Sequence, residues 1–287
     1  MIAFSFSPGG LLLPYHLGVL AALSYHGFVT PDTPLAGSSA GAIAVASHAA
    51  GVPTHVALEA SLRISSQCNP FFLAQGQLMP SLHNELASLF PRHVQHIVNE
   101  RPGVVGLAHL QLYPQRKPVL ATQDFETKQD LMEAVCDSSM FPYFTSNQPF
   151  RIVPRSSTAS GTTSPRIVVD GVFTEPLWRF GCPNLKRSLA DLDRSVSISV
   201  FPKELVGLGW THAPRNVIAP PLQEAPNVAR QITQLGLLMC TPGRRKDLTN
   251  LYENGWKDAE RWVHNEKNTA QEPVRLPKMP CVTSDMG

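Results

Sequence analysis

Short apolar runs and helically spaced apolar residues alternate from the start of this chain. Residues 1–6 are apolar and aromatic enough to predict a buried strand, and the breaker cluster at 7–10 ends it. Leucine and alanine then recur at helical spacing over 15–26, which predicts a helix. Residues 33–36 predict a second, short strand, and the alanine-rich stretch 40–50 predicts the helix that follows it.

The rest of the chain continues this alternation of helices and strands. Helical spacing predicts helices over 52–66, 81–99, 128–136, 223–240 and 245–264, and apolar or β-branched runs predict strands over 104–112, 118–122, 167–169 and 197–201. The polar, low-complexity stretch 154–165 is expected to be a flexible excursion between two strands, and residues 265–287 a flexible tail. Alternating strands and helices predict an α/β fold.

Residues 37–41 read Gly-Ser-Ser-Ala-Gly, the G-x-S-x-G pattern of a nucleophile elbow with Ser39 at its apex. A strand that turns sharply into a helix strains its apex residue, and a side chain at Gly37 or Gly41 would clash in so tight a turn. The turn also places the Ser39 hydroxyl at a helix N-terminus, where the helix dipole favours negative charge. The pattern predicts a serine hydrolase. It lies too early in the chain for the α/β-hydrolase topology.

Gly9 and Gly10 lie in the loop one crossover before the elbow. Acyl transfer develops an oxyanion on the substrate carbonyl, and each preorganised backbone N–H group that binds it is worth about 3 kcal/mol. The amides of Gly9, Gly10 and Leu11 are the candidates, because backbone without a Cβ can approach a substrate closely. An ordinary strand-to-helix turn is the alternative interpretation. The elbow that follows favours the functional one.

Asp170 is the candidate general base. Residues 167–169 form a β-branched run typical of a central strand, and a carboxylate at the carboxyl end of a parallel strand lies on the active-site edge of an open α/β sheet. Asp170 is therefore predicted to accept the Ser39 proton directly, with a plain turn as the alternative. A Ser–His–Asp triad would need a histidine after Asp170. His212 and His264 are available, but their polar surroundings indicate solvent exposure.

These motifs, in this order, resemble the patatin-like phospholipase domain, a family of lipid acyl hydrolases that use a Ser–Asp dyad. Residues 136–144 add to the resemblance, since they are similar to the family's A-S-x-A-x-P-x-x-F segment. The resemblance implies a three-layer α/β/α patatin-like fold with a central, mostly parallel sheet. It also implies Ser39 as the nucleophile, Asp170 as the base, and an oxyanion hole formed by the amides of residues 9–11.

The glycine loop departs from the family pattern in two places. Pro8 stands where the family commonly has glycine, and Leu12-Leu13-Pro14 replaces a further glycine that is often followed by arginine. Because proline has no amide to donate, only the amides after Pro8 can bind an oxyanion. Val172 follows Asp170-Gly171 where the family commonly has glycine or alanine, which is a small change.

The resemblance implies a serine esterase or lipase, of the phospholipase A or acylglycerol lipase type, that cleaves carboxylic esters through an acyl-enzyme without a cofactor. It implies a lipid substrate, met at a peripheral membrane or lipid-droplet surface. A lipid acyltransferase and a catalytically weak lipid-binding or regulatory protein stay open as alternatives. Residues 1–202 are expected to form the catalytic domain, and residues 203–264 a C-terminal helical extension packed on it.

Composition changes this picture little. A formal net charge of +2, and no basic cluster with interleaved aromatics, give no reason to expect nucleic acid. Five cysteines without C-x-x-C spacing suit free thiols, and no secretory signal is visible, so we expect an intracellular protein. His93 and His96 lack a third ligand at suitable spacing, so no metal site is expected. The sequence does not indicate an oligomeric state.

Overall fold

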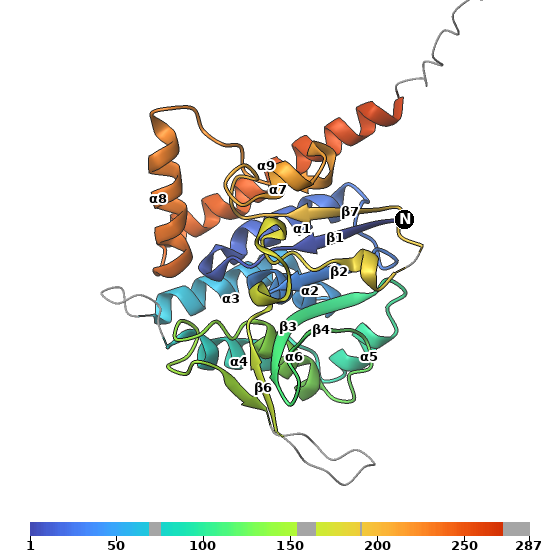
Figure 1. Ribbon diagram of the computed structural model, residues 1–287, viewed down its shortest axis with the longest axis vertical. Coiled ribbons are helices and arrows are strands. Elements are labelled where there is room, and N and C mark those ends of the chain that lie inside the picture. The colour runs from blue at the N-terminus through green and yellow to red at the C-terminus, as the bar shows by residue number, and fades with distance from the viewer. Residues whose placement is uncertain (69–75, 154–164, 190, 272–287) are drawn as a thin grey trace, which may run out of the picture.

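The computed structural model describes residues 1–68, 76–153, 165–189 and 191–271. One eight-stranded sheet runs through the molecule in the order β5-β6-β3-β2-β1-β7-β8, with β4 paired to β3 (Figure 1). The strands are β1 (Ile2–Phe6), β2 (Leu35–Ser38), β3 (Val105–Tyr113), β4 (Lys117–Ala121), β5 (Arg151–Val153), β6 (Arg166–Val169), β7 (Arg194–Ile198) and β8 (Val217–Ile218). The five strands β3, β2, β1, β7 and β8 pair in parallel, whereas the pairings that involve β4, β5 and β6 are antiparallel.

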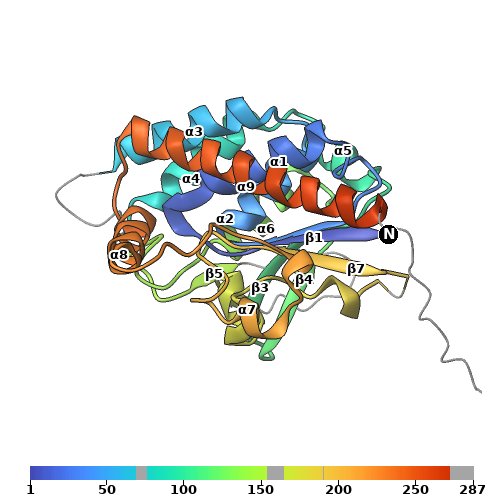
Figure 2. The ribbon, with the colours of Figure 1, turned by 90° about the horizontal axis from the view of Figure 1, so that it is seen from above.

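Long helices cover one face of this sheet (Figure 2). The helices are α1 (Leu13–Tyr25), α2 (Ala40–Ala49), α3 (Thr54–Gln67), α4 (Leu78–Leu89), α5 (Val94–Asn99), α6 (Lys128–Ser138), α7 (Leu208–Thr211), α8 (Asn227–Cys240) and α9 (Arg245–Gln271). Figure 2 shows α1, α3, α4 and α9 on one side of the sheet and α7 on the other. None of the helices in the described residues is both long enough and apolar enough to cross a membrane.

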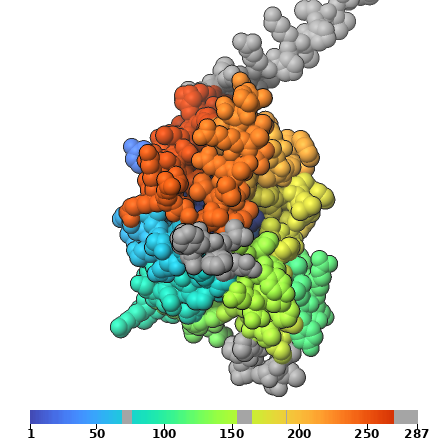
Figure 3. Space-filling view, turned by 90° about the vertical axis from the view of Figure 1, so that its left-hand side faces the viewer, coloured from blue at the N-terminus to red at the C-terminus, as the bar shows by residue number. Residues whose placement is uncertain are grey.

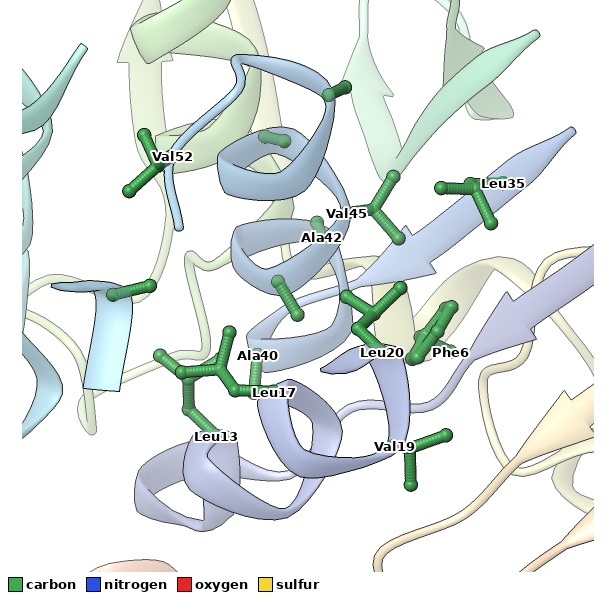
Figure 4. Packing of buried hydrophobic residues seen from close by; sticks show 14 of the residues in the cluster. Phe6, Leu13, Leu17, Val19, Leu20, Leu35, Ala40, Ala42, Val45 and Val52 are labelled. Atoms are coloured by element: carbon green, nitrogen blue, oxygen red, sulfur yellow. The ribbon is translucent and has the colours of Figure 1, made fainter. Parts of the chain in front are cut away.

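Alternation along β1 sends its side chains to both faces of the sheet. Phe4 and Phe6 are fully buried in the main core, which the long helices share, whereas Ala3 belongs to a smaller cluster on the opposite face. In the main core, leucines of α1 pack against the small residues Ala40 and Ala42 of α2 (Figure 4). The alanine-rich sequence of α2 therefore lets two helices and two strands approach closely around the turn that joins β2 to α2.

Short helices cover the opposite face. They are η2 (Gly171–Thr174), η3 (Leu177–Arg179), η4 (Leu185–Arg187) and α7, with η5 (Pro214–Asn216) beside β8. Leu185 packs there against Ala3 and Ala36, and Leu208 of α7 packs in a separate cluster with Cys182. The expected fold class is confirmed as an α/β fold with a mostly parallel central sheet flanked by helices, in which the third layer consists of short helical segments.

The C-terminal helix α9 lies against α1, and glycines stand where the two backbones meet. A Cβ on Gly18 would lie 2.0 Å from the carbonyl oxygen of Tyr252, and a Cβ on Gly255 would lie 2.1 Å from that of Tyr15. Trp262 is buried in the main core. The helical extension thus shares the core of the sheet.

The structure corrects several expectations about the elements. β5, β8 and the short helix α7 were not expected, the strand expected over 197–201 is β7 at Arg194–Ile198, and α9 continues to Gln271 instead of ending at residue 264. The helix expected over 81–99 is divided into α4 and α5, because Phe90 precedes a proline and adopts an extended conformation with ψ 132°. The run 167–169 lies second from the sheet edge as β6, and it is antiparallel to β3.

Several expectations fall on residues that the structure does not describe. They include most of the stretch 154–165, the tail from residue 272 onward, and Cys281. The other four cysteines, which are Cys68, Cys136, Cys182 and Cys240, are free thiols.

Candidate active site

Ser39 stands at the apex of the turn between β2 and α2. It is the N-cap residue of α2, with φ 54° and ψ −123°, a conformation that L side chains rarely adopt. A Cβ on Gly37 would lie 2.3 Å from the carbonyl carbon of Gly41, and a Cβ on Gly41 would lie 2.6 Å from the carbonyl oxygen of Phe6. Any side chain at position 37 or 41 would therefore clash with the backbone, so the turn requires glycine at both. The turn has the strain and the close packing that a nucleophile elbow needs.

Hydrogen bonds from neighbouring segments hold this turn in place. The backbone N–H of Ser39 points at Ser138 at the end of α6, 3.1 Å from its carbonyl oxygen and 3.0 Å from its Oγ. The Ser38 hydroxyl donates to the carbonyl oxygen of Gly181 at 2.6 Å. Ser39 and the residue before it are thus each bonded to a neighbouring segment, which holds the turn in place.

The glycine loop lies against the elbow. A Cβ on Gly9 would lie 3.7 Å from the Cβ of Ala40, and Gly10 has φ 52°, the left-handed region that favours glycine. Gly10 begins η1 (Gly10–Leu12), in which the N–H of Leu12 donates to the carbonyl oxygen of Gly9. The amides of Gly10 and Leu11 donate to no group in the described part of the chain. These two donors beside the elbow, and by the same criterion the N–H of Gly9, have no acceptor among the described residues.

His16 is buried behind the glycine loop and is bonded to it. Its ring is fully buried, and burial lowers the pKa of His16 to about 4, so the imidazole is neutral at pH 7. Nε2 lies 2.8 Å from the carbonyl oxygen of Ser7. Because a carbonyl only accepts, Nε2 carries the hydrogen and donates it. This places His16 as a capping residue of the loop.

Asp170 reaches the elbow from an antiparallel strand, so the route expected from a parallel strand is wrong. β6 pairs with β3 in the register Leu110↔Val169, while β2 pairs with β3 in the register Ser38↔Ala108. The end of β6 therefore lies beside the end of β2. Gly171, the residue after Asp170, confirms the close approach, because a Cβ on it would lie 2.9 Å from the Cβ of Ser38.

The Asp170 carboxyl is fully buried, and its two oxygens differ. Oδ1 accepts a hydrogen bond from the Val172 N–H at 2.8 Å, whereas Oδ2 has no hydrogen-bonding partner in the described part of the chain. Burial raises the pKa of Asp170 to about 7, and the Val172 N–H and the Ser39 hydroxyl act in the opposite direction. Ser39 thus lies close enough to influence the carboxyl without forming a hydrogen bond of good geometry, as is common before substrate binds.

An apolar cavity of about 400 Å³ opens beside Ser39. Its walls are formed by residues of the glycine loop, the elbow, α3, α4, α8 and the segments that follow α6 and Asp170: Pro8, Gly9, Gly10, Leu11, Leu13, Ser39, Ala40, Ile43, Ser61, Ile64, Leu78, Met79, Leu82, Ser139, Phe141, Phe144, Thr145, Val172, Phe180, Met239 and Cys240. Figure 3 faces the end of the molecule at which α8 (orange) lies. A volume of this size is typical of small-molecule sites.

Sequence reasoning missed α8 as part of the site. Met239 and Cys240, near its end, line the cavity, and the carbonyl oxygen of Met239 would lie 2.7 Å from a Cβ on Gly10. It also missed Ser139, whose buried hydroxyl lines the cavity without a hydrogen-bonding partner in the described residues. The sequence predicts a helix over 223–240, but no local signal indicates what it covers.

The histidines weighed for a triad lie elsewhere. Nδ1 of His212 bonds the Thr211 hydroxyl at 2.8 Å, Nε2 of His264 bonds Asn268 at 3.0 Å, and neither ring lines the cavity. The rings of His93 and His96 are 6.1 Å apart. Across the described ranges, no three His, Cys, Asp or Glu side chains gather as a metal ion would need. Among the residues weighed for the site, Ser39 lies close enough to Asp170 to lower the pKa of its carboxyl.

Comparisons with known proteins find similarity at the level of structure. No protein-family model matches the chain, and no curated protein matches it. The crystal structure of VipD from Legionella pneumophila is similar over 90% of this chain, with a TM-score of 0.43 and 13% sequence identity. This chain covers 66% of that protein chain, slightly less than two thirds of it. At this level the likeness carries no information about activity.

Proposed function

We propose that this protein is a serine esterase that hydrolyses carboxylic esters of lipids, as its resemblance to the patatin-like family implies. One observation carries the proposal. A strained serine at a helix N-terminus faces a buried carboxyl whose pKa is raised to about 7, and an apolar cavity opens beside it. A general base works best when its pKa lies near the working pH, so this carboxyl suits proton transfer at neutral pH.

The proposed reaction has two halves. In the first, Oγ of Ser39 attacks the ester carbonyl carbon while Oδ2 of Asp170 takes the hydroxyl proton. The tetrahedral intermediate then collapses, the alcohol leaves with that proton, and an acyl-enzyme forms on Ser39. In the second half, Asp170 takes a proton from water, the hydroxide attacks the acyl-enzyme, and Ser39 regains its proton as the acid leaves.

The free amides of Gly10 and Leu11 are proposed to bind the oxyanion, with the Gly9 amide beside them. They belong to residues that line the cavity next to Ser39, and neither Gly10 nor Leu11 donates to another described group. Pro8 offers no donor, so the hole begins after it. Each such donor is worth about 3 kcal/mol of transition-state stabilisation.

The cavity is proposed to hold the acyl chain. Most of its walls are aliphatic or aromatic, and these apolar walls would favour an alkyl chain over a polar group. Its polar side chains, Ser39, Ser61, Ser139 and Thr145, are uncharged. The chain of a phospholipid or an acylglycerol would therefore enter it, while the headgroup stays at the opening.

Hydrolysis assays on the purified chain test this proposal. We expect turnover of a soluble short-chain p-nitrophenyl ester and of long-chain acyl esters in vesicles or emulsions, all lost in Ser39→Ala. Ser47→Ala is the matched control, because Ser47 is equally buried on α2 and does not line the cavity. Transfer of the acyl group to an added alcohol instead of water would indicate an acyltransferase. Turnover that survives in Ser39→Ala would exclude this site as the source.

A further inference from the structure

Three large apolar side chains are each more than half exposed on the face of the sheet that carries the short helices. Leu177 is 90% exposed, Trp210 is 84% exposed and Trp178 is 55% exposed. Exposing a single apolar residue is ordinary, but a group of such large ones marks a binding surface. None of the three lines the cavity.

These side chains belong to one surface although they come from two separate segments. The Thr211 hydroxyl in α7 donates to the carbonyl oxygen of Trp178 in η3 at 3.2 Å. A Cβ on Gly207, which precedes α7, would lie 2.9 Å from the Cα of Trp178. The backbones of η3 and α7 are therefore in contact, and their apolar side chains project from adjoining positions.

This surface continues to the mouth of the cavity. Val172 and Phe180 line the cavity, and the exposed residues Phe173, Leu177 and Trp178 lie between them in the chain. The Phe173 ring, 45% exposed, stacks on Phe141 at 5.7 Å, and Phe141 itself lines the cavity. We call the set Phe173, Leu177, Trp178 and Trp210 the apolar rim.

We propose that the apolar rim inserts into the surface of a lipid bilayer and holds the cavity mouth against it; the inference rests on the proposed function. Tryptophan and other aromatic rings favour the boundary between lipid and water. The rim borders an apolar cavity, so a chain leaving the bilayer can pass from one apolar environment to another. Glu175, within this segment, is held by both Arg179 and Arg187, so the charge beside the rim is net positive and suits anionic headgroups.

Sedimentation with lipid vesicles tests the proposal on the full chain. Ser39→Ala is used as the background so that the lipid stays intact, and the vesicles contain phosphatidylcholine with or without phosphatidylglycerol. We expect binding that is stronger with the anionic lipid and that falls about tenfold or more in Leu177→Ala/Trp210→Ala. The matched control is Tyr25→Ala/Ile152→Ala, which removes two side chains that are 76% and 60% exposed on other elements. It should bind as the background does.

Hydrolysis of a soluble short-chain ester, measured with Ser39 intact, separates this inference from the proposed function. Leu177→Ala/Trp210→Ala should keep that activity while losing activity on vesicles. If the protein with Ser39 intact hydrolyses no ester but vesicle binding still depends on the apolar rim, the esterase proposal fails and the inference about the rim is supported. Vesicle binding that the rim variant retains, or the absence of any binding, overturns the inference. So does a dimer, seen by light scattering, that the rim variant abolishes, because a second copy would then cover the surface.

Discussion

Ser39 donates its backbone N–H to both oxygens of Ser138, at 3.1 Å for the carbonyl and 3.0 Å for Oγ. The donor belongs to the residue with the strained conformation, and the acceptors belong to the last residue of α6. The segment 136–144, which resembled a family motif, therefore supports the elbow from outside. The strain at Ser39 is sustained by this shared hydrogen bond and by the close packing of Gly37 and Gly41.

Ser138→Ala is expected to loosen the elbow without removing a reacting group. The carbonyl acceptor remains, so the loss corresponds to one hydrogen bond of about 1 kcal/mol, and kcat should fall about fivefold to tenfold with little change in KM. Steady-state kinetics on a soluble ester measures both constants. A change in KM alone would show that Ser138 serves substrate binding instead of the position of Ser39.

Ser39→Gly is expected to be more stable than Ser39→Ala, although both are inactive. Ser39 has φ 54°, which costs a residue with a Cβ about 1–2 kcal/mol and costs glycine little. Urea unfolding gives the two free energies of unfolding. Equal values would mean that the turn relaxes and stores no strain at this residue.

Asp170→Asn is expected to stabilise the protein increasingly as the pH rises. Burial raises the pKa of Asp170 from 3.8 to about 7 in the folded state, so between these values the folded protein binds more protons than the unfolded chain. The free energy of unfolding of the wild type therefore falls as the pH rises through that window, by at most about 1.4 kcal/mol for each pH unit. The asparagine variant lacks this penalty.

Thermal unfolding of Asp170→Asn and wild type at pH 5 and pH 8 measures the effect. The difference in Tm should favour the variant more at pH 8. A difference independent of pH would show that the carboxyl titrates near its ordinary value, and it would remove the basis for a base poised at neutral pH.

Gly10→Ala is expected to abolish most activity. The new Cβ would lie 2.7 Å from the carbonyl oxygen of Met239, so either the loop or α8 must move. Gly51→Ala is the matched control, because Gly51 also has positive φ, 75°, but has nothing within 4 Å of its Cβ position. Both variants carry backbone strain, Gly10→Ala should lose more stability because of the added clash, and only Gly10→Ala should lose turnover. Equal activity in the two would argue against a role for the Gly10 loop as an oxyanion hole.

The local features of the site could be predicted from the sequence, and the features that depend on distant pairings could not. The elbow was predictable because its strain and its two glycines lie within five consecutive residues. The position of Asp170 was inferred from a strand end, but the direction of that strand was wrong, because the order of residues does not say whether β6 pairs in parallel with β3.

The cavity and the apolar rim depend on the whole fold. Met239 on α8 meets Gly10 only after the chain has closed around the sheet, and Trp178 adjoins α7 through a backbone contact that no periodicity indicates. The glycine pair Gly18 and Gly255, which sets the approach of α9 to α1, is equally invisible along the chain.

The rate at which a fluorophosphonate probe labels Ser39, measured against pH, tests most directly whether Asp170 activates this serine. The account predicts that the labelling rate of the wild type rises with pH through an apparent pKa near 7, and that Ser39→Ala is not labelled. Asp170→Asn should be labelled at least about 100-fold more slowly than the wild type, and its rate should show no inflection near pH 7. Labelling of Asp170→Asn at the wild-type rate, with the same dependence on pH, would contradict the Ser39–Asp170 dyad.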